Sequence, residues 1–202
     1  VQAIAGEARI TFTLSEPGVV QCRVRQGNQT AVAAATVSPY QIDALEAEPA
    51  DFDAFWQSAK AELRAVPMDA QLTEYSSDEY STTFRISLAH LDNRRIYGYI
   101  SIPKGTAPYP AVLTLPPLGA SPNIVKPEDV LASKGGVIAL TIGIHHAPPG
   151  EQDPNAYEPN DLGVPEKFYD RLAVLAGIRA IDYLFTRSDF NGRLGIVGVS
   201  QG

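Results

Sequence analysis

Residues 198–202 read Gly-Val-Ser-Gln-Gly and place a serine in the pattern Gly-x-Ser-x-Gly. This pattern is typical of the nucleophile elbow of serine hydrolases, a strand-to-helix turn so tight that only small residues fit beside the serine. The turn lifts the hydroxyl clear of the sheet, where a base can take its proton and the oxygen can attack a carbonyl carbon. Ser200 is therefore the candidate nucleophile of this chain.

The residues before Ser200 predict the elements that such a turn requires. Residues 193–199 form a short apolar run rich in β-branched side chains, which is typical of a buried strand. Residues 168–186 repeat apolar side chains at helical spacing, and residues 188–192 between the two segments have the composition of a turn. A helix, a short turn, a buried strand and then Gly-x-Ser-x-Gly is the element order of an α/β-hydrolase.

The middle of the chain predicts the rest of a sheet. Residues 82–90 and 95–102 alternate polar and apolar side chains and predict an antiparallel hairpin. Residues 109–115 and 136–142 are continuous apolar runs, which predict buried strands, and a helix over roughly residues 123–134 connects them. The pattern predicts an α/β fold, an incomplete α/β-hydrolase with a doubly wound, mostly parallel sheet and an antiparallel edge.

Two further segments flank these strands. Residues 49–56 open a helix with acidic residues in its first turn and aromatic residues along one face, and Pro67 ends it. Residues 143–163 form a proline-rich loop. Structureless loops of about twenty residues are uncommon and often functional, which makes this loop a candidate part of a site.

The first forty residues differ from the rest of the chain. Residues 9–14, 21–25 and 31–37 are short candidate strands separated by turn residues, a pattern typical of antiparallel β-structure. We therefore expect three parts: a partial, immunoglobulin-like β-sandwich module over residues 1–40, a linker over 41–48, and the N-terminal part of an α/β-hydrolase catalytic domain over 49–202.

Composition excludes several classes of partner. The net charge of −7 argues against a nucleic-acid partner, because phosphates need a basic face. The chain has one cysteine, Cys22, so neither an internal disulfide framework nor a cysteine-rich zinc site is expected. No apolar run approaches the ~18 residues of a membrane span. We expect no metal and no cofactor.

Three segments resemble one family of α/β-hydrolases, the acetyl xylan esterases and cephalosporin C deacetylases. Residues 49–56, Pro-Ala-Asp-Phe-Asp-Ala-Phe-Trp, resemble its entry helix, and residues 95–103 resemble its hairpin. Residues 195–202 match its elbow, in which a glutamine such as Gln201 follows the nucleophile. The resemblance covers residues 46–202. It implies a serine carbohydrate esterase that removes acetyl groups from acetylated xylan or related sugars, is secreted or periplasmic, and assembles into homo-oligomers.

The resemblance also implies which groups stabilise the reaction. Backbone amides of Gln201 and Leu118 would form the oxyanion hole for the tetrahedral intermediate. Leu118 follows Pro116 and Pro117, which replace the His-Gly of the family, and proline has no N–H to donate. The loop must therefore be shaped differently from that of its relatives. By the same resemblance, Tyr169 and Arg171 are expected to support the elbow.

The base of the triad is expected outside these 202 residues. In α/β-hydrolases the acid and the histidine follow the serine, so we expect this chain alone to be inactive. His90 is expected on the surface of the hairpin. His145 and His146 follow a strand at the edge where α/β sites form, but adjacent side chains diverge and would not chelate one metal ion. The acids before Ser200 are expected on helix surfaces or in turns: Asp170, Asp182 and Asp189.

Two other functions fit the same sequence. The chain could belong to a non-catalytic relative that binds polysaccharide or protein, or to another α/β-hydrolase, such as a peptidase or a dienelactone hydrolase. Residues beyond 202 would separate these alternatives, because a catalytic acid and histidine there indicate an enzyme. We also expect poor folding of the 202 residues alone, because the strand before Ser200 would lack a neighbour on one side.

Overall fold

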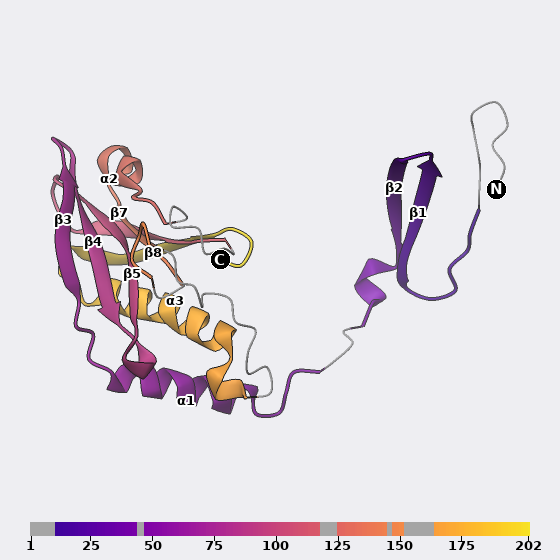
Figure 1. Cartoon of the computed structure of the whole chain (residues 1–202), viewed down its shortest axis with the longest axis horizontal. Coiled ribbons are helices and arrows are strands. Elements are labelled where there is room, and N and C mark those ends of the chain that lie inside the picture. The colour runs from indigo at the N-terminus through magenta and orange to yellow at the C-terminus, as the bar shows by residue number, and fades with distance from the viewer. Residues whose placement is uncertain (1–10, 44–46, 118–124, 145–146, 152–163) are drawn as a thin grey trace. The chain divides into compact units, whose positions relative to one another are not determined.

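The computed structural model describes residues 11–43, 47–117, 125–144, 147–151 and 164–202 (Figure 1). The chain divides into two compact units, Val1–Ala50 and Asp51–Gly202. Within the described ranges, no helix is long and apolar enough to span a bilayer.

In its described residues, the first unit contains a hairpin. Strand β1 (Gly18–Gln26) pairs antiparallel with β2 (Gln29–Val37), and a short 3-10 turn, η1 (Pro39–Gln41), follows. These two strands confirm the predicted strands at residues 21–25 and 31–37. The strand predicted at 9–14 is wrong for residues 11–14, which have no regular structure, and its first two residues lie outside the described ranges. The β-sandwich module stays a prediction.

The second unit is built on a six-stranded mixed sheet in the order β3-β4-β5-β7-β6-β8. Strands β3, β4, β5 and β7 pair antiparallel, and β7, β6 and β8 pair parallel. The predicted α/β fold class is confirmed. The strands are β3 (Gln71–Ser77), β4 (Ser81–Ala89), β5 (Arg95–Pro103), β6 (Tyr109–Leu115), β7 (Ile138–Ile142) and β8 (Phe190–Gly198).

Helices lie on both faces of this sheet (Figure 1). Helix α2 (Asp129–Gly135) contacts β4, β5 and β7, whereas α3 (Tyr169–Phe185) contacts β6, β7 and β8 on the opposite face. Helix α1 (Phe52–Ala65) packs on α3, and η3 (Pro165–Lys167) precedes α3. The doubly wound arrangement predicted from the sequence is therefore present in these residues.

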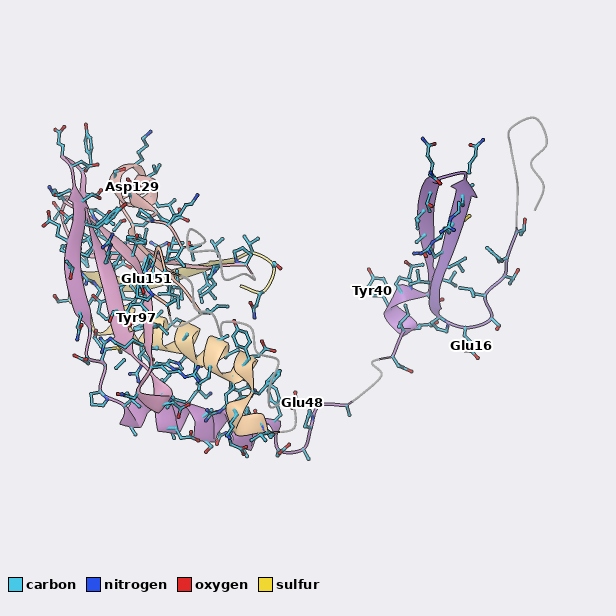
Figure 2. The ribbon with its side chains drawn as sticks, in the orientation of Figure 1. Glu16, Tyr40, Glu48, Tyr97, Asp129 and Glu151 are labelled. Carbon is cyan, nitrogen blue, oxygen red and sulfur yellow. The ribbon has the colours of Figure 1, made fainter. Side chains whose placement is uncertain are left out.

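Helix α2 is shorter than the helix predicted at residues 123–134. It begins at Asp129, which Figure 2 labels, and ends at Gly135, followed by Gly136 as a cap in the left-handed conformation. Pro127 explains the later start, because proline disfavours a helical conformation in the residue before it. Residues 123 and 124 lie outside the described ranges. Glycine suits the left-handed helix cap because it has no Cβ.

The core is formed by apolar side chains of the central strands and of α3. Leu113 on β6, Leu140 on β7 and Leu184 on α3 are fully buried. Among the described residues, β8 pairs only with β6, so it lies at the sheet edge as expected. Ile196 and Val197 of β8 are 54% and 51% exposed. The strand that carries the elbow is thus supported on one side.

Candidate active site

The turn after β8 has the backbone geometry of an elbow. Ser200 adopts a φ of 57°, in the left-handed region that non-glycine residues seldom enter. The Gly202 N–H donates to the Val199 carbonyl at 3.1 Å and closes the turn. Such local strain is typical of functional sites and of the strand-to-helix turn that exposes a nucleophile. The role of Ser200 as the nucleophile stays a prediction.

Both glycines of the motif are required by close backbone approach. A Cβ on Gly198 would overlap the carbonyl oxygen of Gly202. A Cβ on Gly202 would lie 2.7 Å from the carbonyl carbon of Leu115 and 2.9 Å from its Cβ. The turn therefore folds back on its own strand and also contacts the end of β6. Glycine is the residue that permits such contacts.

The elbow lies at the carboxyl edge of the parallel strands. Leu115 of β6 is the register partner of Gly198 of β8, so the residues that follow each strand are neighbours. Pro116 is buried and Pro117 is half-buried at this edge. Leu118, the second predicted oxyanion donor, lies outside the described residues. The oxyanion roles of Leu118 and Gln201 stay predictions.

A pocket of about 500 Å³ lies between the elbow and α3. The Gln201 side chain reaches it, and its Oε1 atom is buried without a hydrogen-bond partner among the described residues. Sequence reasoning missed this pocket, although small residues one helical turn apart on α3 were a signal for space on that face. Its lining is mostly apolar: Leu115, Ile144, Asp170, Ala173, Val174, Gly177, Ile178, Ile181, Gln201 and Gly202.

Arg171 binds α1 rather than the elbow. Its guanidinium donates to Glu62 Oε2 at 2.6 Å and to the Glu166 carbonyl at 3.2 Å, and it lies 5.9 Å from the centre of the Phe55 ring. The side chain is 4% exposed. The expectation that Arg171 supports the elbow is therefore corrected, because its cation neutralises a carboxylate of α1. Tyr169 is the first residue of α3.

Arg179 joins the same two helices at the other end of α1. One guanidinium nitrogen donates to the Leu63 carbonyl at 2.6 Å and to the Val66 carbonyl at 3.1 Å. Burial lowers the pKa of Arg179, and the nearby Asp182 carboxylate opposes that effect. Carbonyls at a helix C-terminus lack partners within the helix and carry partial negative charge. Arg179 therefore caps α1 and fixes it against the helix that leads into β8.

The histidines and acids do not form a triad with Ser200 in the described residues. His90 is 1% exposed, so its expected surface position is wrong: the end of β4 is covered where the hairpin folds back, and its N–H donates to the Arg94 carbonyl at 2.9 Å. His145 and His146 lie outside the described residues. Asp189 is a turn acid as expected, and pairs with Arg187. The described residues contain no cluster of His, Cys, Asp and Glu able to hold a metal ion.

The mixed sheet, the helices on both faces and the elbow define the class of this protein: the chain contains part of an α/β-hydrolase fold. The acetyl xylan esterase (AXE1) family model matches residues 34–142, more than half of the chain. The chain belongs to this family of ester hydrolases. The matched residues exclude the elbow, so the family assignment and the geometry of Ser200 are separate observations.

Individual relatives agree with this assignment. The chain is 29% identical over 208 residues to the acetyl esterase Axe7A of Xylanibacter ruminicola, covering 94% of this chain and 47% of that protein. It spans about half the length of that curated relative. Its fold is similar to acetyl xylan esterase 1 from Thermoanaerobacterium sp., with TM-score 0.64, 22% identity and coverage of 76% and 52% of the two chains. An acetyl xylan esterase from Paenibacillus sp. R4 gives TM-score 0.61, 24% identity and coverage of 74% and 52%.

Proposed function

We propose that the full-length protein is a serine esterase that removes acetyl groups from acetylated xylan or related sugars, with Ser200 as its nucleophile. The observation that carries this proposal is the left-handed backbone of Ser200, between two glycines that admit no side chain. Family membership and the name of the Xylanibacter relative support an acetylated carbohydrate as the substrate.

The proposed reaction has two steps. Ser200 Oγ attacks the acetyl carbonyl carbon while its proton passes to a histidine base, and the sugar oxygen leaves with a proton after the tetrahedral intermediate collapses. Water then attacks the acetyl-enzyme and releases acetate. Backbone amides of Gln201 and Leu118 would stabilise the oxyanion, an effect worth about 3 kcal/mol for each donor.

We also propose that residues 1–202 alone do not hydrolyse acetyl esters. Of the residues that the structure describes, one is a histidine, and that residue, His90, is buried at the end of β4. In the strand order, β5, β7 and β6 lie between β4 and β8. Since the acid and the histidine follow the serine in α/β-hydrolases, the catalytic base is expected beyond Gly202.

The test compares the full-length protein with its Ser200→Ala variant on a chromogenic acetyl ester and on acetylated xylan. Hydrolysis of both by the wild type, and a loss of at least about 10³-fold in the variant, are expected. Ser188→Ala, at an exposed serine in the turn before β8, is the matched control and should keep full activity. Unchanged hydrolysis by Ser200→Ala would exclude this mechanism. Binding of xylan without turnover by the wild type would indicate a non-catalytic relative.

We propose further that residues 1–40 are part of an antiparallel β-sandwich. Residues directly opposite in an antiparallel pair share one face of the sheet. In this hairpin Cys22 faces Ala33 and Val24 faces Ala31, whereas Arg23 and Arg25 lie on the other face. An apolar face of this kind packs on a second sheet in a sandwich. Slow labelling of Cys22 by a thiol reagent in the full-length protein would support the module, and rapid labelling would oppose it.

A further inference from the structure

A second pocket lies at the hairpin between β4 and β5, apart from the elbow. Its volume is about 560 Å³, which is within the usual range of small-ligand sites. Its lining combines apolar residues from the end of α1 and from β4 with polar residues from the hairpin tip. The residues that matter most are Val66, Pro67 and Ala89 on the apolar side, and Asp92, Asn93 and Arg94 on the polar side.

The pocket lies at the same sheet edge as the elbow. Register partners form one row across the sheet, near the ends of β7, β6 and β8: Tyr99 on β5, Thr141 on β7, Thr114 on β6 and Val197 on β8. Because β5 runs antiparallel to β7, the hairpin tip before Arg95 projects beyond this row on the side of the elbow. Three strand spacings separate β5 from β8, roughly 14 Å. A short run of linked sugar units is long enough to span that separation.

A network of hydrogen bonds holds the residues around the pocket in place. The Arg95 guanidinium donates to Asp69 Oδ2 and to the Asp69 carbonyl, both at 2.6 Å, and to Ser87 Oγ at 2.5 Å. The Ala89 N–H donates to the Met68 carbonyl at 3.0 Å. These bonds tie β4 and β5 to the segment that follows α1. A site held in one shape loses less conformational entropy when it binds a ligand.

The groups at the tip remain available for a ligand. Asp92 and Asn93 adopt φ values of 55° and 57°, and their side chains are exposed beside that of Arg94. No described residue forms a hydrogen bond or ion pair with these three side chains. The Asp92 carboxylate accepts, the Arg94 guanidinium donates, and the Asn93 amide does both. Neighbouring hydroxyls of a sugar ring need this mixture of donors and acceptors.

The charges of the pocket favour a neutral ligand. Arg95 is balanced by Asp69 at 2.6 Å, and Arg94 and Asp92 are two positions apart in the chain with opposite charges. The lining therefore has no excess of either sign to attract a phosphate or a metal ion. The apolar side chains of Val66 and Pro67 in the lining suit the C–H face of a sugar ring.

We infer that this pocket binds an unacetylated sugar unit of the polysaccharide whose acetyl groups are removed at Ser200. The inference rests on the proposed function, because it makes the pocket a second subsite for the same substrate. The pocket would hold one sugar unit of the polysaccharide at the hairpin while an acetylated unit of the same polysaccharide reaches Ser200 at the elbow. The affinity for polymer should then exceed the affinity for a small acetyl ester.

The experiment uses the full-length protein and two substitutions that spare the fold. Asn93→Gly removes the amide and keeps the left-handed turn, since glycine tolerates a positive φ. Arg94→Ala removes an exposed guanidinium. Arg64→Ala is the matched control, at an exposed arginine of α1 that does not line the pocket. Each protein is titrated with unacetylated xylohexaose by calorimetry and assayed on acetylated xylan and on a small chromogenic acetyl ester.

The combined Asn93→Gly and Arg94→Ala variant should bind xylohexaose at least about tenfold more weakly, a change of about 1.4 kcal/mol. Its KM for acetylated xylan should rise by a similar factor, with kcat and small-ester hydrolysis unchanged. Equal binding by variant and wild type, or no binding of xylohexaose by the wild type, would overturn the inference. A different result would overturn the proposed function: no hydrolysis of either acetylated xylan or the small acetyl ester by the wild type. A loss of small-ester hydrolysis in the variant would also overturn the inference, because it places these residues in the reaction itself.

Discussion

Gly202 contacts the end of β6 so closely that a Cβ at this position would lie 2.7 Å from the carbonyl carbon of Leu115. The last glycine of the motif thus joins the elbow to the neighbouring parallel strand. Because Pro116 and Pro117 follow Leu115 directly, this contact also fixes where the loop proposed to carry the oxyanion donor Leu118 begins relative to Ser200. A change at Gly202 should therefore alter the geometry of the reaction as well as stability.

The first prediction concerns this contact. Gly202→Ala in the full-length protein should lower kcat for acetyl ester hydrolysis at least about 100-fold, since a misplacement of about 1 Å can have that effect. It should also lower the free energy of unfolding by about 1–3 kcal/mol through overpacking. Gly195→Ala on β8, the strand before the elbow, is the control, because its Cβ would meet Val112 Cγ2 at an ordinary 3.8 Å. Equal effects of the two substitutions would contradict the role assigned to the Gly202 contact.

The second prediction concerns the cap that Arg179 provides for α1. Arg179→Met keeps the apolar length of the side chain and leaves the carbonyls of Leu63 and Val66 without their donor. We expect the free energy of unfolding of the full-length protein to fall by about 2–4 kcal/mol, measured by urea denaturation. Arg193→Met, at an exposed arginine of β8, should change it by less than about 0.5 kcal/mol. A similar small change for Arg179→Met would show that the cap contributes little.

The third prediction concerns acid stability. Hydrogen bonds from the backbone N–H groups of Ser81 and Tyr80 lower the pKa of Asp78 below its ordinary value of 3.8. Because the pKa in the folded state lies below that in the unfolded state, the stabilisation is present above pH 3.8 and is lost as the pH falls through the folded pKa. Asp78→Asn should therefore be less stable than wild type at pH 7, and this difference should shrink below pH 4.

Unfolding by urea at a series of pH values measures this difference. Glu79→Gln is the control, at an exposed acid of the same turn that accepts no hydrogen bond from a described residue. Its free energy of unfolding should differ from that of the wild type by less than about 0.5 kcal/mol at each pH. A stability difference for Asp78→Asn that stays constant from pH 7 to pH 2 would refute the linkage to Asp78.

The fourth prediction concerns the 202 residues as an isolated chain. Strand β8 has one neighbour among the described residues, and Ile196 and Val197 are more than half exposed on its two faces. An unpaired edge with apolar side chains favours association over cooperative folding. We expect a urea unfolding slope below that of a complete domain of this size, together with concentration-dependent aggregation. A slope normal for the length, in a monomeric sample, would argue against this expectation.

Much of the local structure follows from the sequence by itself. The run at Tyr109–Leu115 is mostly apolar, and its strand has the predicted bounds because a strand covered on both faces needs few polar positions. The pattern Gly-x-Ser-x-Gly likewise predicts the turn at Ser200, because two glycines and a strand in front of them leave few alternatives for the backbone. These features depend on residues within one turn or one strand.

The burial of His90 and the partners of Arg171 and Arg179 were decided by the tertiary structure. Each depends on which helix or hairpin covers the residue, and the covering elements are distant in the sequence: Arg179 binds carbonyls of α1 more than a hundred positions earlier. Strand order acts in the same way. By placing β5 antiparallel beside β7, it brings the tip at Asn93 to the sheet edge that carries Ser200. Pairing between distant strands depends on the summed packing of the whole sheet, so no local pattern of residues could predict it.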